Sequence, residues 1–169
     1  MNSSRRENYF IDRNLWLSSS STNFFKHCRI ENYQDSGKGG QKRNRKYSAV
    51  RLTHIPTGIS VTSAECREQN INRLKALEKL KIKMAMMLSG PNVDIPRSII
   101  SIQSPDYPLW VAFLMDELYR DDFEITSSAE RLGISNSKLL KLIFRDKIIW
   151  NELNSNRMKL GKHSFVLPG

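Results

Sequence analysis

The sequence has only two cysteines, Cys28 and Cys66, and no long run of apolar residues. Two cysteines cannot build a disulfide framework, which favours a reducing compartment. No stretch approaches the roughly 18 apolar residues of a transmembrane helix, and the N-terminus has no continuous apolar segment of the kind a secretory signal needs. Its Arg and Ser content is faintly typical of an organelle transit peptide, but Glu7 and Asp12 count against that. We therefore expect a cytoplasmic location, with a mitochondrial one as the alternative.

Acidic residues are scarce, with 17 Asp and Glu against 27 Lys and Arg in 169 residues. The net charge is +10 and the isoelectric point is about 9.8. Such an excess indicates an anionic partner, nucleic acid first and an acidic membrane surface second. Hydrophobic residues make up 39% of the chain, which is enough for a core. The length fits one domain, or one small domain with a helical appendage.

The common signatures of cofactor and metal chemistry are also missing. The His and Cys residues of the chain do not have the spacing of metal ligands. They are His27, Cys28, His54, Cys66 and His163. There is no Ser-His-Asp or paired-carboxylate pattern. A Walker A loop is excluded because Gly37-Lys38 is followed by Gly39 rather than by Ser or Thr. We expect no metal and no cofactor, and we expect His54 to pack or hydrogen-bond locally.

The hydrophobic pattern predicts an α+β fold, a small mixed β-sheet with one long helix, followed by an α-helical C-terminal region. Residues 25–32, 47–54 and 59–63 have strand signals, and Pro56-Thr57-Gly58 is a turn between the last two. Apolar spacings of three and four predict a helix over residues 66–88. Its expected buried stripe is Ile71, Leu74, Leu77, Leu80, Met84 and Leu88.

Composition divides the chain into an arm (1–24), the α+β domain (25–89), a proline-containing linker (90–106) and a helical region (107–169). Apolar residues in the arm favour a short amphipathic helix that docks on the rest of the chain. Residues 125–146 are helix-turn-helix-like: Ser127-x-x-Glu130 is a capping box, Gly133 a turn and Ser135 a second cap. We favour a packed helical hairpin there over DNA reading, because the second helix has few side chains for base contacts. Trp150 is expected in the core.

Between two predicted strands lies the segment Ser36-Gly37-Lys38-Gly39-Gly40-Gln41-Lys42-Arg43-Asn44-Arg45-Lys46, which has three glycines, five cations and no acid. Glycine permits backbone conformations with positive φ and close approach of the backbone to a ligand. Free N–H groups and cations both favour binding to phosphates. On composition alone, the alternative to a phosphate-binding loop is a flexible basic hairpin loop.

This segment and its surroundings resemble the GGQ domain of class I peptide-chain release factors. The resemblance rests on residues 36–41, on Asn44, on Ser48-Ala49-Val50-Arg51-Leu52-Thr53-His54-Ile55-Pro56-Thr57-Gly58-Ile59, and on Arg67-x-Gln69-x-x-Asn72-Arg73-x-x-Ala76. It covers residues 28–88 or so. The string Gly-Gly-Gln alone is weak, but its combination with the strand-turn-strand and the helix motif is specific.

The resemblance implies hydrolysis of the ester between peptide and tRNA in the large ribosomal subunit. It implies that Gly39, Gly40 and Gln41 are catalytic, the Gln41 backbone N–H stabilising the oxyanion and its side chain helping to exclude other nucleophiles. No general base is needed, and none lies between Ser36 and Lys46. It also implies the ribosome as partner, through large-subunit rRNA and the P-site peptidyl-tRNA, with the protein as a monomer.

The sequence departs from the family pattern in two places and lacks one part of it. Lys42-Arg43 stands where many members have His-Val, and Glu68 stands where Ser is common. The family reads stop codons with a Pro-x-Thr or Ser-Pro-Phe tripeptide on a separate domain, and neither string occurs here. About 35 residues before the loop are too few for another domain. We therefore expect codon-independent release, as in ribosome rescue.

Eight cations are candidate RNA contacts: Lys38, Lys42, Arg43, Arg45, Lys46, Arg51, Arg67 and Arg73. Two other functions stay open at this point. One is a ribosome- or RNA-binding protein without catalysis that keeps the loop. The other, weaker one is a DNA-binding regulator that uses residues 125–146.

Overall fold

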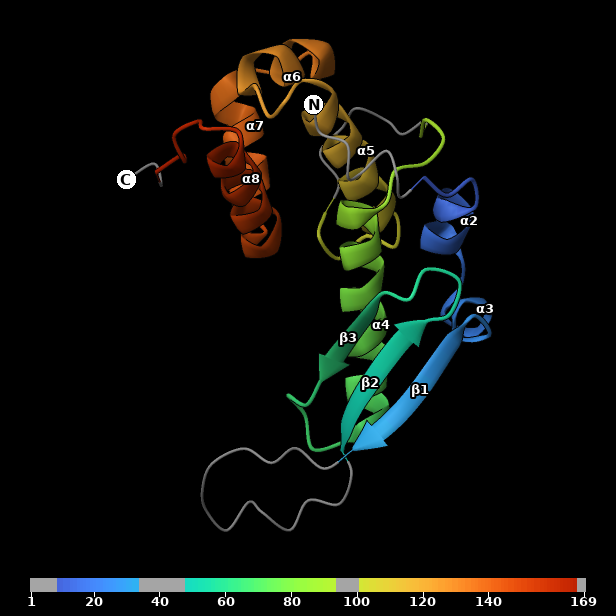
Figure 1. Ribbon diagram of the computed structural model, residues 1–169. Helices are drawn as coiled ribbons and strands as arrows, with labels where there is room; N and C mark the ends of the chain where they lie inside the picture. The colour runs from blue at the N-terminus through green and yellow to red at the C-terminus, as the bar shows by residue number, and fades with distance from the viewer. Residues whose placement is uncertain (1–8, 34–47, 94–100, 167–169) are drawn as a thin grey trace, which may run out of the picture.

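The computed structural model describes residues 9–33, 48–93 and 101–166. Within them the fold is α+β, as the sequence predicts (Figure 1). The strands are β1 (Cys28–Tyr33), β2 (Ala49–His54) and β3 (Ser60–Ser63). The helices are α2 (Arg13–Ser18), α3 (Ser21–Phe25), α4 (Gln69–Met87), α5 (Tyr107–Arg120), α6 (Ile125–Leu132), α7 (Asn136–Phe144) and α8 (Lys147–Lys159).

The three strands form one sheet in the order β1-β2-β3, and both strand pairings are antiparallel, so this sheet is not mixed. Gly58 makes the β2–β3 turn with a φ of +69°, a value that L side chains rarely adopt. The first strand begins later than predicted, because Phe25 belongs to α3. The Ser20 side chain caps α3 by accepting from the Asn23 backbone N–H, and Phe24 on α3 is buried.

The long helix α4 covers the inner face of the sheet, as Figure 1 shows. The predicted stripe is right from Leu77 onward and wrong in its first turns, where Ile71 and Leu74 are 39% and 50% exposed. The buried position in that part of the helix belongs to a polar residue, Asn72. Hydrogen bonding therefore takes the place of apolar packing at the start of α4.

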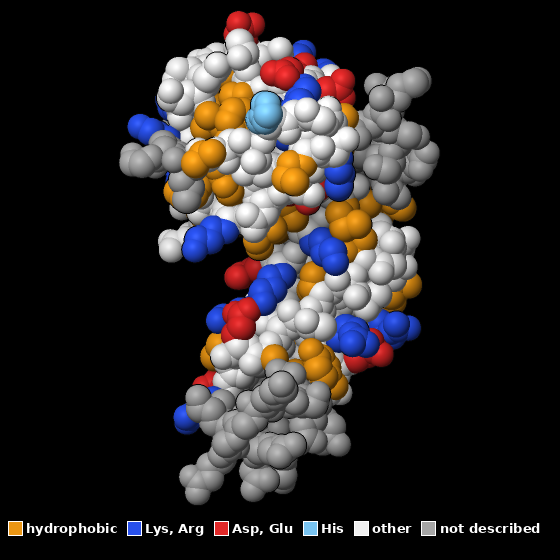
Figure 2. Space-filling view, turned by 60° about the vertical axis from the view of Figure 1, so that its left-hand side comes forward, with side chains coloured by type: hydrophobic (Ala, Val, Ile, Leu, Met, Phe, Trp, Pro, Cys, Tyr) orange, Lys and Arg blue, Asp and Glu red, His pale blue; other side chains and the backbone are white. Residues whose placement is uncertain are grey.

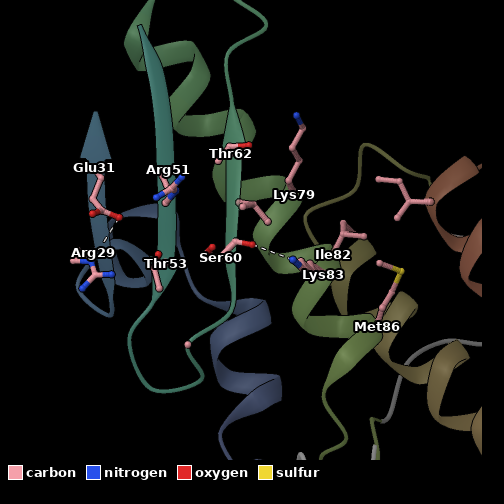
Figure 3. Close-up of a pocket in the computed structure, with 13 residues that line it drawn as sticks. Arg29, Glu31, Arg51, Thr53, Ser60, Thr62, Lys79, Ile82, Lys83 and Met86 are labelled. Carbon is pink, nitrogen blue, oxygen red and sulfur yellow. Dashed lines mark hydrogen bonds and ion pairs between the residues drawn. The ribbon is translucent and has the colours of Figure 1, made fainter. Parts of the chain in front are cut away.

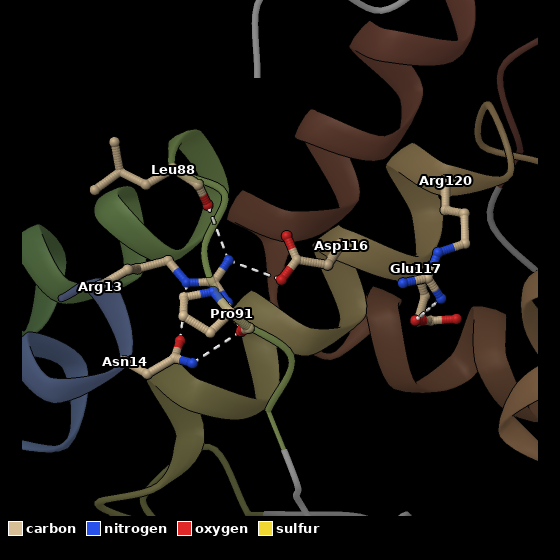
Figure 4. Close-up of polar contacts among 7 residues, drawn as sticks. All are labelled: Arg13, Asn14, Leu88, Pro91, Asp116, Glu117 and Arg120. Carbon is tan, nitrogen blue, oxygen red and sulfur yellow. Dashed lines mark hydrogen bonds and ion pairs between the residues drawn. The ribbon is translucent and has the colours of Figure 1, made fainter. Parts of the chain in front are cut away.

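Helix α2 docks on α4 and α5 through a buried charged residue as well as through the apolar Leu17 (Figure 4). Arg13 is fully buried, and its Nη1 lies 2.7 Å from a carboxylate oxygen of Asp116 on α5. The same guanidinium donates to the carbonyls of Leu88 and Pro91. The expected amphipathic helix is only partly right, because Leu17 is buried while Leu15 is 68% exposed.

Helices α6 and α7 follow α5 and are joined by a three-residue turn. Gly133 has a φ of +67° and ends α6, and Ser135 caps α7 by accepting from the Lys138 N–H, as predicted. The predicted capping box is wrong, because α6 begins at Ile125 and Ser127 lies inside it. Ile125 is buried, so core packing fixes the start of this helix.

Helix α8 closes the helical region and holds the chain that follows it. Trp150 is 8% exposed and contacts Phe144 edge to face, as expected of a core residue. Asn154 exchanges two hydrogen bonds with the Phe165 backbone. The buried Arg157 donates to the carbonyls of Phe123 and His163. These polar residues attach the segment after α8 to the helical region by hydrogen bonds.

Candidate nucleic-acid interface

Most of the predicted site residues lie outside the described part of the chain. They are Gly39, Gly40 and Gln41, with the neighbouring cations Lys38, Lys42, Arg43, Arg45 and Lys46. The structure describes the chain on both sides of this segment and the remaining candidates, which are Arg51, Arg67 and Arg73.

The sheet brings the end of β1 and the start of β2, which flank residues 34–47, next to each other. Tyr33, the last residue of β1, pairs with Ala49, the first of β2. Figure 1 shows this end of the sheet at the bottom of the molecule, while α6 and α7 lie at the opposite end. The catalytic candidates are therefore connected to a rigid strand pair at one tip of the molecule.

Asn72 fixes the start of β2 from the side of α4. Its side chain is fully buried, and its Nδ2 donates to the carbonyls of Ser48 at 2.7 Å and Cys66 at 2.9 Å. Its Oδ1 accepts from the Cys66 N–H at 2.9 Å. One amide thus joins three segments, namely the approach to β2, the loop after β3 and α4. Sequence reasoning singled out Asn72 as part of a motif but did not find this role.

The three described arginine candidates lie in different surroundings. Arg51 is exposed on β2, with its guanidinium 5.6 Å from the centre of the Tyr33 ring. Arg67 is exposed in the loop before α4. Arg73 is half-buried and lies over the Phe25 ring at 4.3 Å. Arg51 and Arg67 are therefore open to a ligand, whereas a part of Arg73 is used in packing.

Arg51 lies in a groove of about 850 Å³ that runs from the outer face of the sheet past β3 to α4 and the first turn of α8 (Figure 3). Four of its lining residues are cations, Arg29, Arg51, Lys79 and Lys83, and one, Glu31, is an acid. Figure 2 shows the hollow on this side of the molecule, with Lys and Arg side chains on both sides of it. The hydroxyls and cations that line the groove suit a phosphate backbone.

Some of these cations already have partners. Arg29 is 3.8 Å from Glu31, and Lys79 pairs with Glu65, outside the groove. Hydrogen bonds from Lys79 and then Lys75 hold the pKa of the Glu65 carboxyl below its ordinary value. Lys83 donates to a backbone oxygen of β3. These exposed pairs are weak, so a polyanion can compete for the cations.

Sequence reasoning missed Arg29 as part of this groove. The residue stands at an exposed position of β1, on the same face of the sheet as Arg51. Strand alternation carries that signal, but only once the register of the two strands is known. Lys79 and Lys83 lie in the cation-rich stretch of α4, and the sequence alone does not indicate that they face the same groove as Arg51.

His54 lies on the other face of β2 and is fully buried, so it is no candidate for surface chemistry. Its Nδ1 is 2.9 Å from the Thr57 hydroxyl, and its ring packs against Trp16 and Phe24. Burial first, and then the nearby His27, lower the pKa of His54 to about 4. The expectation that His54 packs and bonds locally is confirmed.

The described residues contain neither a metal-type cluster nor a membrane-spanning helix. In residues 9–33, 48–93 and 101–166, no three His, Cys, Asp or Glu side chains gather as metal ligands would. None of the helices in those ranges combines the length and apolar character that a membrane crossing requires.

Comparison with known proteins matches residues 24–95 to the RF-1 domain. Peptide chain release factor 1 of Lactobacillus delbrueckii subsp. bulgaricus is 45% identical over 69 residues, which are 41% of this chain and 19% of the relative. Peptide chain release factor 1 of Macrococcus caseolyticus is 57% identical over 56 residues, 33% of this chain and 15% of the relative. Peptide chain release factor 2 of Paramagnetospirillum magneticum is 49% identical over 57 residues, 34% and 15% respectively.

The family match includes residues 34–47, the strand pair and α4 with Asn72, and it ends before α5. The matched part spans less than a fifth of the length of these curated relatives. Over residues 24–95, this chain carries the RF-1 domain of the peptide chain release factors.

Proposed function

We propose that this protein hydrolyses the ester of peptidyl-tRNA on the ribosome without reading a codon. The observation that carries the proposal is the RF-1 match over residues 24–95, which contains Gly39-Gly40-Gln41. In this proposal residues 25–89 are the hydrolase domain, 1–24 an arm, 90–106 a linker and 107–169 a helical region. The protein works wherever its ribosomes are, in the cytoplasm or, alternatively, in mitochondria.

The proposed chemistry needs an oxyanion donor more than it needs a base. Water attacks the ester carbon, and the tetrahedral oxyanion accepts a hydrogen bond from the Gln41 backbone N–H. Gly39 and Gly40 allow the backbone conformation that aims this donor. The segment from Ser36 to Lys46 holds no Asp, Glu or His, which agrees with a site whose remaining groups come from RNA.

The described part of the domain supports this proposal by its geometry. The paired ends at Tyr33 and Ala49, together with Asn72, form a fixed base for the segment that carries the motif. The groove around Arg51 supplies positive charge on the same half of the molecule as these paired strand ends, and the sequence of the segment adds five cations. A narrow basic domain of this kind suits entry into a site built of RNA.

The test is release of labelled peptide from ribosome–peptidyl-tRNA complexes that lack a stop codon. The natural chain should release peptide, and Gly40→Ala should reduce the rate at least 100-fold, which is about the loss of one oxyanion donor. Ser155→Ala, at an exposed position of α8, is the control and should keep the rate of the natural chain. We expect Gly39→Ala and Gly40→Ala to be at least as harmful as Gln41→Ala, because the latter keeps its backbone N–H.

Two other results would each contradict the proposal. Sedimentation with ribosomes but no release from any complex would leave a binding protein without catalysis. Preference for one DNA duplex at physiological salt, with no ribosome binding, would favour a regulator that acts through residues 125–146.

A further inference from the structure

The outer face of α7 carries a row of cations that the release function does not use. Lys138, Lys141 and Arg145 occupy positions i, i+3 and i+7, where Arg145 caps the helix. At about 100° per residue these three positions fall within roughly 60° of arc. All three are exposed, and none of them forms an ion pair within the described ranges, whereas Arg120 and Arg131 nearby are both paired with Glu117.

The opposite face of α7 holds the row in place. Leu139 and Ile143 are fully buried, and the Ser135 cap and the left-handed Gly133 fix the start of the helix relative to α6. From residue 136 to residue 145 the sequence has three cations and no acid. The row is therefore a rigid line of positive charge about 10 Å long at 1.5 Å per residue.

We propose that this face of α7 is a docking surface for the backbone of double-stranded RNA. The positive charge of the face indicates a polyanionic ligand, since each cation can neutralise one phosphate. A duplex is favoured over a single strand, because single strands are held by stacking on aromatic rings. No aromatic side chain is exposed on α7.

The choice of RNA over DNA has a physical part and a functional part. Ser137 is the one neutral polar side chain beside the cation row, so the face contacts phosphates rather than reading base edges. A helix that reads no bases has no need to enter a major groove, and the major groove of A-form RNA is too narrow for it. The functional part rests on the proposed function, which places the protein among RNA helices.

The position of α7 allows this surface to bind RNA away from the strand ends. The helix lies at the opposite end of the molecule from the strand ends that flank residues 34–47 (Figure 1). The two ends can therefore contact different parts of one large RNA assembly. Such a second contact takes the place of codon reading as the source of binding.

The test compares two double variants of the full chain with the same change in charge. Lys138→Gln with Lys141→Gln removes two cations of the row, and Lys26→Gln with Lys159→Gln removes two exposed cations elsewhere. Binding to a labelled 20-base-pair RNA duplex is measured by fluorescence anisotropy at several salt concentrations. We expect the α7 pair to weaken binding about tenfold and to reduce the log–log salt slope by about two, and the control pair to do less than half as much on both measures.

Three results would overturn the proposal. One is an equal loss for the two double variants. Another is tighter binding of the natural chain to a DNA duplex of the same sequence than to the RNA duplex. The third is an equal loss of affinity for single-stranded RNA. The assay contains no peptidyl-tRNA, so its outcome is independent of peptide release, and urea unfolding midpoints confirm that both variants fold.

Discussion

At the scale of single residues, Asn72 does the most for the candidate site. It is fully buried, and its amide donates twice and accepts once between segments that are distant in sequence. Replacing the amide by a carboxylate keeps the size but turns the donor toward Ser48 and Cys66 into an acceptor. A buried donor–acceptor pair converted into two facing acceptors typically costs about 2–3 kcal/mol.

We therefore expect Asn72→Asp to lower the free energy of unfolding by about 2–3 kcal/mol in urea titrations. We also expect it to slow peptide release at a temperature at which the variant is still folded, because Ser48 leads directly into β2. Asn70→Asp is the matched control, since Asn70 is exposed on the same helix. A stable Asn72→Asp protein would show that the three hydrogen bonds contribute little.

His54 gives the protein a pH dependence that can be assigned to one group. Its pKa is about 4 when folded, against about 6.5 for an unperturbed histidine. Below pH 6.5 the unfolded chain binds a proton that the folded chain rejects, so stability falls as the pH drops toward 4 and is fully present above pH 6.5. At pH 5 the loss should be about 2 kcal/mol relative to pH 7.5.

Chemical denaturation at the two pH values checks this expectation. His54→Phe keeps an aromatic ring beside Trp16 and Phe24 and removes the titrating group, so its stability should change less between them. The exposed His163 provides the control, and His163→Gln should behave as the natural chain does. Parallel pH profiles for the natural chain and His54→Phe would assign the effect to another group.

At the scale of elements, the sequence predicts which helices and strands exist better than where they begin. The strand-turn-strand from Ala49 to Ser63 follows from alternation and from the turn residues, and Gly133 and Ser135 are read correctly because their chemistry is local. The start of α6 was misplaced because Ile125 is fixed by burial in a core formed by distant residues. The hydrogen bonds of Asn72 were not predicted for the same reason, since its partners are set by tertiary structure.

The docking of α2 shows the same limit. An apolar pattern predicted a docking helix, and beside the buried Leu17 the helix docks through Arg13, whose partner Asp116 is 103 positions away. Arg13 is fully buried and Asp116 is 20% exposed. No sequence period marks such a pair, because a buried charge is tolerated only where the fold supplies its partner.

The Arg13–Asp116 pair joins α2 to α5, and the losses on removing its two partners should not add. We expect Arg13→Met to lower the free energy of unfolding by about 3 kcal/mol, because it leaves the carbonyls of Leu88 and Pro91 without this donor. Asp116→Asn should cost a similar amount, and the double variant less than the sum of the two. Additive losses in a double-mutant cycle would show that the two residues act separately.

At the scale of the whole molecule, positive charge is concentrated in three groups of residues. The segment from Lys38 to Lys46 contributes five cations by sequence, the groove around Arg51 four and the α7 face three. The groove and the α7 face are separated along a molecule that is elongated in Figure 1. A long distribution of charge favours one extended polyanion over a small anionic ligand.

Binding to ribosomes should therefore depend steeply on salt. Neutralising about five phosphates implies a slope of roughly −3.5 to −4.5 in a plot of log affinity against log salt concentration. Arg51→Gln with Lys83→Gln, both in the groove, should make the slope shallower by about two. Lys26→Gln with Lys159→Gln removes the same charge outside the three basic regions, so it should change the slope by less. Affinity that changes little between 50 and 200 mM salt (roughly the range over which such contacts weaken) would mean that apolar contacts, such as those available at the exposed Ile148 beside the groove, dominate binding instead.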